Sequence, residues 1–359
     1  MPKISRRQAL AVATAVLACV VVAVVLLKGG DSAAPRHQPE ARHTETTKDA
    51  RPKARRSARK PGRRKHARPR RKSGTRLVAF GGGGPLIGLA DNRPETFSDP
   101  RFAGTGIKRV RVAVPFDDVA LGGTRRRIQD AYFAAARRQG VDPLVSFYRS
   151  SANPERLPSV AEFGRDFELF RSRYPWLKSF STWNEANFRS QPTRRDPERT
   201  AAFYRLLRDR CSGGRCTVVA CDFRPDGSSA AASWLERFKS AAGPGRHIWG
   251  LSSYVDVNRQ STGLTRDFLR RTSGPVWVTE VGAINFFGRG IKPNIPRQTR
   301  RMHFLLTRYP AVSRRIQRLY VYHWRAAAGD NLFDSGLLDL NGQERPAYRE
   351  FVRAIGKSG

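Results

Sequence analysis

The chain has 359 residues, of which 39% are hydrophobic, and carries a formal net charge of +37. This length is sufficient for one large domain with a substantial core plus additional segments, which excludes a small domain without such a core. The excess of basic residues favours anionic partners, and on charge alone nucleic acid, an anionic membrane surface and an acidic polysaccharide are all admissible.

Residues 1–28 have the pattern of a targeting segment. Lys3, Arg6 and Arg7 precede an uncharged apolar run at 9–27, whose length lies between that of a signal-peptide core and that of a membrane-spanning helix. We predict an uncleaved signal anchor with a cytoplasmic N-terminus, and a cleaved signal peptide is the alternative. Either reading places the remainder outside the cytoplasm, as the extracytoplasmic domain of a single-pass membrane protein or as a secreted protein.

Residues 29–75 contain almost no apolar side chains, and 13 of the 22 residues at 51–72 are Lys or Arg. Such a segment cannot bury enough surface to offset chain entropy, so we predict a disordered basic linker. Because an export signal precedes it, we expect contact with anionic envelope polymers or lipid head groups, and no specific nucleic acid. A solvated spacer without a specific partner is the alternative.

Residues 76–359 alternate between β-rich runs and helical patterns. Helices are predicted at 124–139, 160–174, 197–210 and 296–309, and strands at 77–80, 110–116, 143–147, 177–183, 217–220, 248–255, 276–279 and 319–324. This alternation predicts a (β/α)8 TIM barrel. A doubly wound open sheet is the rival architecture, but Gly81–Gly84 is followed by Pro85 and does not form the G-x-G-x-x-G pattern of that fold.

Two of the predicted strands end on a glutamate. The run at 177–183 leads into Asn184 and Glu185, and the run at 276–279 leads into Glu280. In a barrel the carboxyl ends of the strands converge on one face, so these distant residues are expected to meet there. Two facing carboxyl groups are the requirement for glycoside hydrolysis.

The sequence resembles the retaining glycoside hydrolases of clan A, which are (β/α)8 enzymes of the cellulase-like and xylosidase-like families. W-N-E-A-N at 183–187 is similar to the W-N-E-P-N signature of the clan, and W-V-T-E-V-G at 277–282 is similar to W-x-T-E-x-G. Arg111, Tyr254 and Trp324 match the clan's residues on strands two, six and eight. G-L-L-D at 336–339 and R-P-A-Y at 345–348 resemble its closing pattern. The resemblance covers approximately residue 76 to the C-terminus.

This resemblance implies a retaining glycosidase that acts on an oligo- or polysaccharide without a cofactor. It implies that Glu185 is the acid/base, with a pKa raised by apolar neighbours such as Trp183 and Phe188. It implies that Glu280 is the nucleophile, kept ionised by Arg111 and the Tyr254 hydroxyl. Asn184 would donate to the sugar 2-hydroxyl, and Trp324 would stack on a sugar, with Phe147, Tyr148 and Phe287 as looser candidates that are also explained by core packing.

The sequence departs from the clan pattern at two places. Ala186 stands where a proline usually follows the acid/base, and Ser252 and Ser253 stand where many members have a histidine before the tyrosine. The sequence therefore does not decide which residues contact the nucleophile. The alternative function is a catalytically degenerate carbohydrate-binding barrel at the cell envelope. The basic barrel favours an acidic glycan, although a charge excess is also typical of a solvated surface.

The cysteines and histidines indicate a disulfide more than a metal site. Cys211 and Cys216 bracket a short Gly-rich loop, and in an exported domain they can form a disulfide, which leaves Cys221 as a free thiol. The 6 His are scattered, so no metal ligand is predicted.

Overall fold

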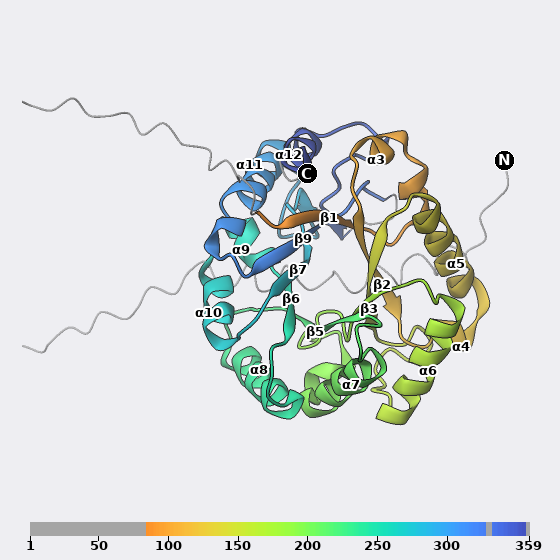
Figure 1. Ribbon diagram of the computed structural model, residues 1–359. Helices are drawn as coiled ribbons and strands as arrows, with labels where there is room; N and C mark the ends of the chain where they lie inside the picture. The colour runs from red at the N-terminus through yellow and green to blue at the C-terminus, as the bar shows by residue number, and fades with distance from the viewer. Residues whose placement is uncertain (1–83, 328–331, 357–359) are drawn as a thin grey trace, which may run out of the picture.

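The computed structural model describes residues 84–327 and 332–356. Its strands close into a parallel barrel that is surrounded by helices, which confirms the predicted (β/α)8 architecture (Figure 1). In their order around the barrel the strands are β1 (Leu86–Ala90), β2 (Arg109–Pro115), β3 (Asp142–Tyr148), β4 (Ser179–Ser181), β5 (Thr217–Phe223), β6 (Ile248–Ser252), β7 (Val276–Val281) and β9 (Ile316–Tyr322).

The predicted anchor at 1–28, the predicted linker at 29–75 and the predicted strand at 77–80 lie outside the described residues. Within the part of the chain that is described, no helix has the length and apolar character needed to span a bilayer.

The helices follow the strands in the expected alternation. They are α3 (Pro100–Gly104), α4 (Asp118–Leu121), α5 (Gly123–Arg138), α6 (Val160–Arg173), α7 (Pro197–Arg210), α8 (Ser229–Ala242), α9 (Tyr254–Arg259), α10 (Gly263–Arg271), α11 (Ile295–Thr307) and α12 (Pro346–Ile355), with 3-10 turns η1 (Pro94–Ser98), η2 (Pro192–Arg195) and η3 (Pro310–Val312). Side chains at the N-caps fix where several of them begin: Ser159, Asp196 and Ser228 each accept a hydrogen bond from a backbone N–H of the first turn.

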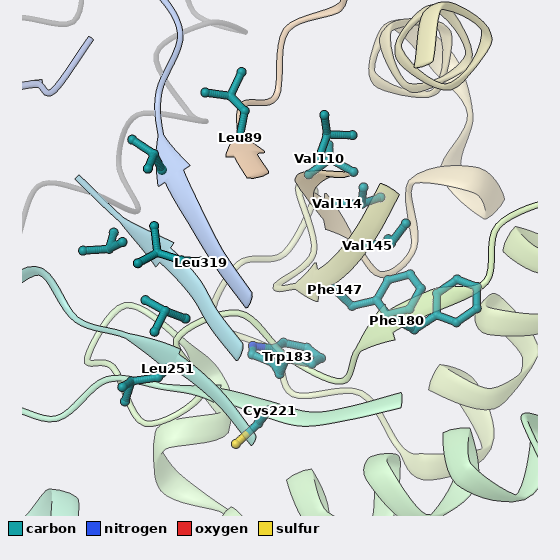
Figure 2. Close-up of a cluster of buried hydrophobic side chains, with 14 of the residues drawn as sticks. Leu89, Val110, Val114, Val145, Phe147, Phe180, Trp183, Cys221, Leu251 and Leu319 are labelled. Carbon is teal, nitrogen blue, oxygen red and sulfur yellow. The ribbon is translucent and has the colours of Figure 1, made fainter. Parts of the chain in front are cut away.

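The strands are buried on both faces, as expected for a parallel sheet covered by helices. Outward-facing side chains pack against the helices (Figure 2), where Phe147 contacts three phenylalanines of α6 at ring-centroid distances of 5.2–5.9 Å. Phe147 is 1% exposed and therefore belongs to the core. A separate cluster fills the barrel interior and consists of Ala90, Leu144, Val219, Trp277 and Tyr320.

The first described strand of the barrel, β1, was not predicted. Its sequence is LIGLA, and the glycine in its centre weakens the strand pattern. A Cβ at Gly88 would lie 2.7 Å from the Arg109 carbonyl oxygen and 2.9 Å from the Tyr320 ring. The close packing of the barrel interior therefore requires glycine at this position.

A disulfide and a short β-ribbon connect segments outside the barrel strands. Cys211 and Cys216 form the predicted disulfide between the end of α7 and the start of β5, and Cys221 is a buried free thiol. A short antiparallel ribbon of β8 (Phe286–Phe287) and β10 (Phe333–Asp334) joins the segments that follow β7 and β9. Phe287 and Phe333 pack there against Tyr254, so Phe287 is also a core residue.

Candidate active site

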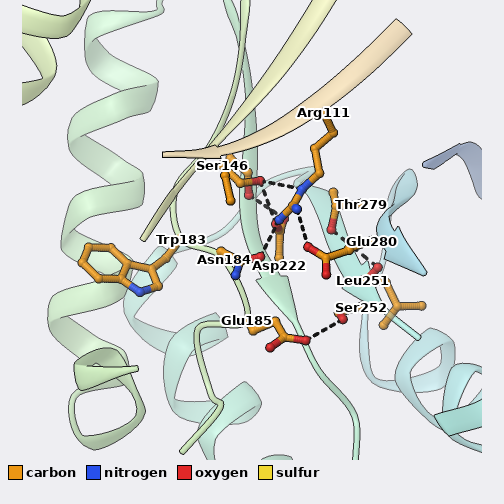
Figure 3. Close-up of polar contacts among 12 residues, drawn as sticks. Arg111, Ser146, Trp183, Asn184, Glu185, Asp222, Leu251, Ser252, Thr279 and Glu280 are labelled. Atoms are coloured by element: carbon orange, nitrogen blue, oxygen red, sulfur yellow. Dashed lines mark hydrogen bonds and ion pairs between the residues drawn. The ribbon is translucent and has the colours of Figure 1, made fainter. Parts of the chain in front are cut away.

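Glu185 and Glu280 lie at the carboxyl-terminal end of the barrel, at the ends of strands that are separated by β5 and β6. Glu185 follows β4, and Glu280 is the second-to-last residue of β7. Both residues are buried, with exposed fractions of 6% and 7%. Ser252 connects them, because it is the register partner of Glu280 and its hydroxyl donates to Glu185 Oε1 at 2.8 Å. The predicted meeting of the two glutamates at one end of the barrel is thus what the fold produces (Figure 3).

Arg111 is the central cation of the site. It lies on β2, is 1% exposed, and donates to Glu280 Oε2, to Asn184 Oδ1, to Asp222 Oδ2 at 2.9 Å and to Ser146 Oγ at 3.2 Å. Burial alone lowers the pKa of Arg111, but Glu280 and Asp222 outweigh this effect and the pKa lies above its usual value. The guanidinium therefore stays charged and joins residues of β2, β3, β5 and β7 with the segment after β4.

Asp222 is a site residue that the sequence analysis missed. It is fully buried on β5 and accepts hydrogen bonds from the hydroxyls of Ser146 at 2.8 Å and Ser181 at 2.6 Å, in addition to its ion pair with Arg111. The signal that could have found it is an aspartate within the otherwise apolar strand sequence TVVACDF. A charge in such a strand requires a buried partner.

Glu280 is held by two donors. Arg111 Nη1 donates to Oε2, and the Tyr254 hydroxyl donates to Oε1 at 3.0 Å. Both oxygens of the carboxylate therefore have a donor, and the two hydrogen bonds fix its orientation. The structure thus brings Arg111 and Tyr254 to Glu280, and the replacement of the clan's histidine by Ser252 does not remove these contacts.

Glu185 has different surroundings. Burial raises its pKa to about 7; the positive charge of Arg224 opposes this change and the negative charge of Glu280 adds to it. Arg224 Nε lies 3.5 Å from Glu185 Oε1, and the Arg224 guanidinium stacks 3.9 Å from the centre of the Phe188 ring. A carboxyl group with a pKa near neutrality can both give and take a proton at neutral pH.

The predicted role of Trp183 in burying Glu185 was wrong. Its ring is directed away from the two glutamates (Figure 3) and stacks on Phe203 at 5.8 Å, while its Nε1 donates to Gln191 at 3.1 Å. Phe188 contributes through Arg224, because it supports the guanidinium that faces Glu185.

The backbone around Glu185 is strained in a specific way. Glu185 has a φ of 45°, in the left-handed region that non-glycine residues rarely adopt. Its neighbours are fixed: Asn184 N–H donates to the Phe147 carbonyl at 2.7 Å, and Ala186 N–H donates to the Asp222 carbonyl at 2.9 Å. A proline at 186 would lack this second donor, so Ala186 adds an anchor to β5.

Asn184 is oriented by Arg111. Its Oδ1 accepts from Arg111 Nη2, which directs the amide nitrogen away from the guanidinium, and within the described residues no acceptor is hydrogen-bonded to Nδ2. Asn184 therefore presents a donor beside the two glutamates.

The structure does not bring Trp324 to this site. Trp324 is 1% exposed, packs edge-on against Phe102 and Tyr348 at 5.7 Å, and donates from Nε1 to Asp99 at 3.1 Å. It lies beyond the end of β9, where the chain no longer follows the strand. Tyr322, the last residue of β9, is half-buried and packs near the Tyr254 cluster, so it is the β9 aromatic on the side of the glutamates.

No group of three or more His, Cys, Asp or Glu side chains that could hold a metal ion occurs in the part of the chain that the structure describes. The polar groups at the site are hydrogen-bonded mainly to one another.

Comparison with known proteins supports the architecture. No protein-family model and no curated protein sequence matches the chain. An endo-1,4-β-xylanase from Caldicellulosiruptor owensensis is similar in structure, with a TM-score of 0.56 and 12% identity over 75% of this chain and 96% of the xylanase. A psychrophilic glycoside hydrolase family 10 endo-β-1,4-xylanase has a TM-score of 0.56 and 13% identity over 75% and 96%. A glucosidase from Croceicoccus marinus has a TM-score of 0.55 and 12% identity over 77% and 68%. At these identities the likeness shows the fold alone, a barrel shared with these glycoside hydrolases.

The first prediction from this geometry concerns Arg111. Arg111→Met should lower the free energy of unfolding by about 3–5 kcal/mol, because it leaves the buried carboxylates of Asp222 and Glu280 without their cation. Urea denaturation measures this change. Arg210→Met is the control, since Arg210 forms an exposed ion pair with Glu168, and it should change the free energy by less than about 1 kcal/mol. Equal effects of the two substitutions would contradict the central role of Arg111.

The second prediction concerns the pH dependence of stability. The pKa of Glu185 is about 7 in the folded state against its ordinary value of 4.5, so between these values the folded state holds a proton that the unfolded state has lost. The free energy of unfolding should therefore fall as pH rises through this window. Glu185→Gln removes the titrating group, so relative to this variant the wild type should lose on the order of 2–3 kcal/mol across the window. A difference that is independent of pH would show that Glu185 has an ordinary pKa.

Proposed function

We propose that this protein is a retaining glycoside hydrolase that acts on an oligo- or polysaccharide, with Glu185 as acid/base and Glu280 as nucleophile. The observation that carries the proposal is the contrast between the two buried carboxyl groups. Glu185 has a pKa of about 7, whereas the Glu280 carboxylate is held in one orientation by hydrogen bonds from Arg111 and Tyr254. One protonated and one ionised carboxyl group, about 5 Å apart, are what the retaining mechanism requires.

In the first step, a carboxylate oxygen of Glu280 attacks the anomeric carbon and the glycosidic bond breaks. The departing oxygen receives the proton of Glu185, so the products are a glycosyl ester on Glu280, a free alcohol and an ionised Glu185. In the second step Glu185 takes a proton from water as the water oxygen attacks the anomeric carbon, and Glu280 leaves as a carboxylate. Both side chains then return to their initial states.

Two neighbouring residues assist this sequence. Asn184 offers its amide N–H to the sugar 2-hydroxyl, because its oxygen is already bonded to Arg111. Arg111 orients both Asn184 and Glu280, so it is a positioning residue. The similar structures include an endo-1,4-β-xylanase and a glucosidase, which supports a glycan substrate for this protein.

We further propose that the protein acts outside the cytoplasm, anchored in the membrane by residues 1–28 or secreted. The apolar run in that segment and the Cys211–Cys216 disulfide support this location, since disulfides persist in oxidising compartments. The basic segment at 29–75 would then contact anionic envelope polymers or lipids.

A panel of aryl glycosides tests the assignment of the two glutamates. Glu185→Gln should lower kcat/KM by about 10²–10⁴-fold for poor leaving groups, which need the proton, and much less for dinitrophenyl glycosides, which do not. Glu280→Gln should abolish turnover of both classes because no nucleophile is present. A 2-fluoro glycoside should label the wild type at Glu280, as read by peptide mass.

The control is Glu198→Gln, which removes an exposed carboxylate on α7 that pairs with Arg237 and should leave all rates unchanged. If the wild type binds glycans but neither cleaves nor is labelled by any member of the panel, the carbohydrate-binding alternative holds.

The pH dependence of the reaction supplies an independent prediction. Glu185 must be protonated to act as the acid, so kcat/KM should fall as pH rises above about 7. Arg224 lowers the pKa of Glu185, so Arg224→Gln should move this alkaline limb to higher pH. Arg137→Gln, an exposed change on α5, is the control and should not move it. A limb that stays in place in Arg224→Gln would exclude Glu185 as its origin.

A further inference from the structure

A cavity of about 220 Å³ lies beside the proposed acid/base. It is formed by the segments that follow β4 and β5 and by the beginning of α8. Its polar lining includes Asn187, Arg189, Arg194, Arg224, Asp226 and Ser228. Its volume is below the ~300–1,000 Å³ of pockets that enclose drug-sized ligands, so it suits a single ring or one charged substituent.

Arg224 is the most buried charged residue that lines this cavity. It is 3% exposed, and its Nε and Nη2 have no hydrogen-bond partner among the described residues. Nε is close enough to Glu185 for an ion pair at 3.5 Å but does not form a hydrogen bond with it. A buried guanidinium N–H without an acceptor is costly, which indicates that an acceptor is supplied by a ligand.

The Arg224 guanidinium is also held in place before any ligand arrives. The guanidinium stacks 3.9 Å from the centre of the Phe188 ring, so the ring covers one of its faces and fixes its plane. The Asn187 side chain donates to the Arg224 carbonyl and accepts from the Arg224 N–H, both at 2.8 Å. The segments that follow β4 and β5 are therefore fixed to each other where they line the cavity.

The charges around the cavity favour an anion. Arg189 and Arg194 are exposed at its rim, and no ion pair involves either of them in the described parts of the chain. Asp226 carries the opposing charge, but its Oδ1 accepts hydrogen bonds from the backbone N–H and the hydroxyl of Ser228. Ser228 in turn caps α8, whose positive helix end faces the same region.

The position of the cavity identifies which part of a substrate it would contact. It is connected to Glu185 through Arg224 and through the residues that directly follow Glu185 in the chain. In the proposed reaction Glu185 protonates the oxygen that leaves with the departing sugar, whereas Glu280 keeps the other sugar. A group in this cavity therefore belongs to the departing sugar.

We propose that this cavity is a subsite for an anionic substituent of the departing sugar, such as the carboxylate of a uronic acid or a sulfate or phosphate ester. Arg224 binds the anion at the base of the cavity, and Arg189 and Arg194 bind it at the rim. The inference deepens the proposed function and rests on it for the identity of the departing sugar. It makes the protein selective for acidic glycans.

The test compares two aryl glycosides that carry the same sugar and differ only in the leaving group, 5-carboxy-2-nitrophenol or its neutral 5-carboxamide. In the full-length wild type, kcat/KM should be higher for the carboxylate. The ratio of the two values should fall about tenfold in Arg189→Gln/Arg194→Gln, because two charge-assisted contacts are lost. These two side chains are exposed, so the variant is expected to fold.

The matched control is Arg137→Gln/Arg138→Gln, which removes the same charge from the exposed surface of α5 and should leave the ratio unchanged. The chemical source of the anion is identified by transfer. Glucuronate, glucose 6-sulfate and glucose 6-phosphate are compared with glucose as acceptors that release the fluorosugar from Glu280. The anion is identified by the acceptor that releases the fluorosugar fastest relative to glucose, provided that this rate advantage is lost in Arg189→Gln/Arg194→Gln.

Calorimetric titration of each variant with the same four sugars separates this inference from the proposed function. If no glycoside is cleaved but an anionic sugar binds the wild type and not Arg189→Gln/Arg194→Gln, the subsite stands and the hydrolase proposal falls. If glycosides are cleaved but the carboxylate leaving group is not preferred, the subsite is refuted while the hydrolase proposal stands. The same holds if glycosides are cleaved and anionic sugars bind the wild type and Arg189→Gln/Arg194→Gln equally.

Discussion

The site depends on a buried positive charge that has to be neutralised. Arg111 places a guanidinium inside the barrel mouth, where solvent cannot stabilise it, and its four donor contacts are to Glu280, Asp222, Asn184 and Ser146. These partners come from strands that are far apart in the sequence, so the charge can be satisfied only when the barrel is closed. The same ion pairs that stabilise the fold therefore hold the proposed nucleophile in one orientation.

The strand β5 has a second organising role. The Asp222 carbonyl accepts from Ala186 N–H and the Asp222 N–H donates to the Trp183 carbonyl at 2.8 Å, so β5 holds both sides of the strained Glu185 backbone. Two residues further along, Arg224 faces the Glu185 carboxyl group. The proposed nucleophile is thus positioned through the side chain of Asp222 and Arg111, and the proposed acid/base through the backbone of the same aspartate.

Most of the architecture could be predicted from local sequence, because alternating β-rich runs and capped helices are local signals. The glutamates could be predicted because each ends a strand. Asp222 was missed because the register of β5 against β6 shifts between Val219 and Asp222, so a count of alternating positions fails across that irregularity. Only the presence of an aspartate in an apolar strand sequence indicated it. The prediction for Trp324 was wrong because the strand ends too early. Continued alternation from Tyr320 and Tyr322 would have turned Trp324 inward, but β9 ends at Tyr322.

No local sequence pattern predicts the contact between Arg224 and Glu185. Arg224 has two effects, because it lies next to Glu185 and also lines the cavity. It lowers the pKa of Glu185, and it lines the proposed anion subsite. An anion bound to its free N–H groups would offset part of its positive charge, so the ionised form of Glu185 would be less stabilised. Glu185 would then hold its proton to higher pH in the complex than in the free protein. An acidic substrate would in this way favour the protonation state that its own cleavage requires, because one guanidinium lies between the charge that is recognised and the carboxyl group that donates the proton.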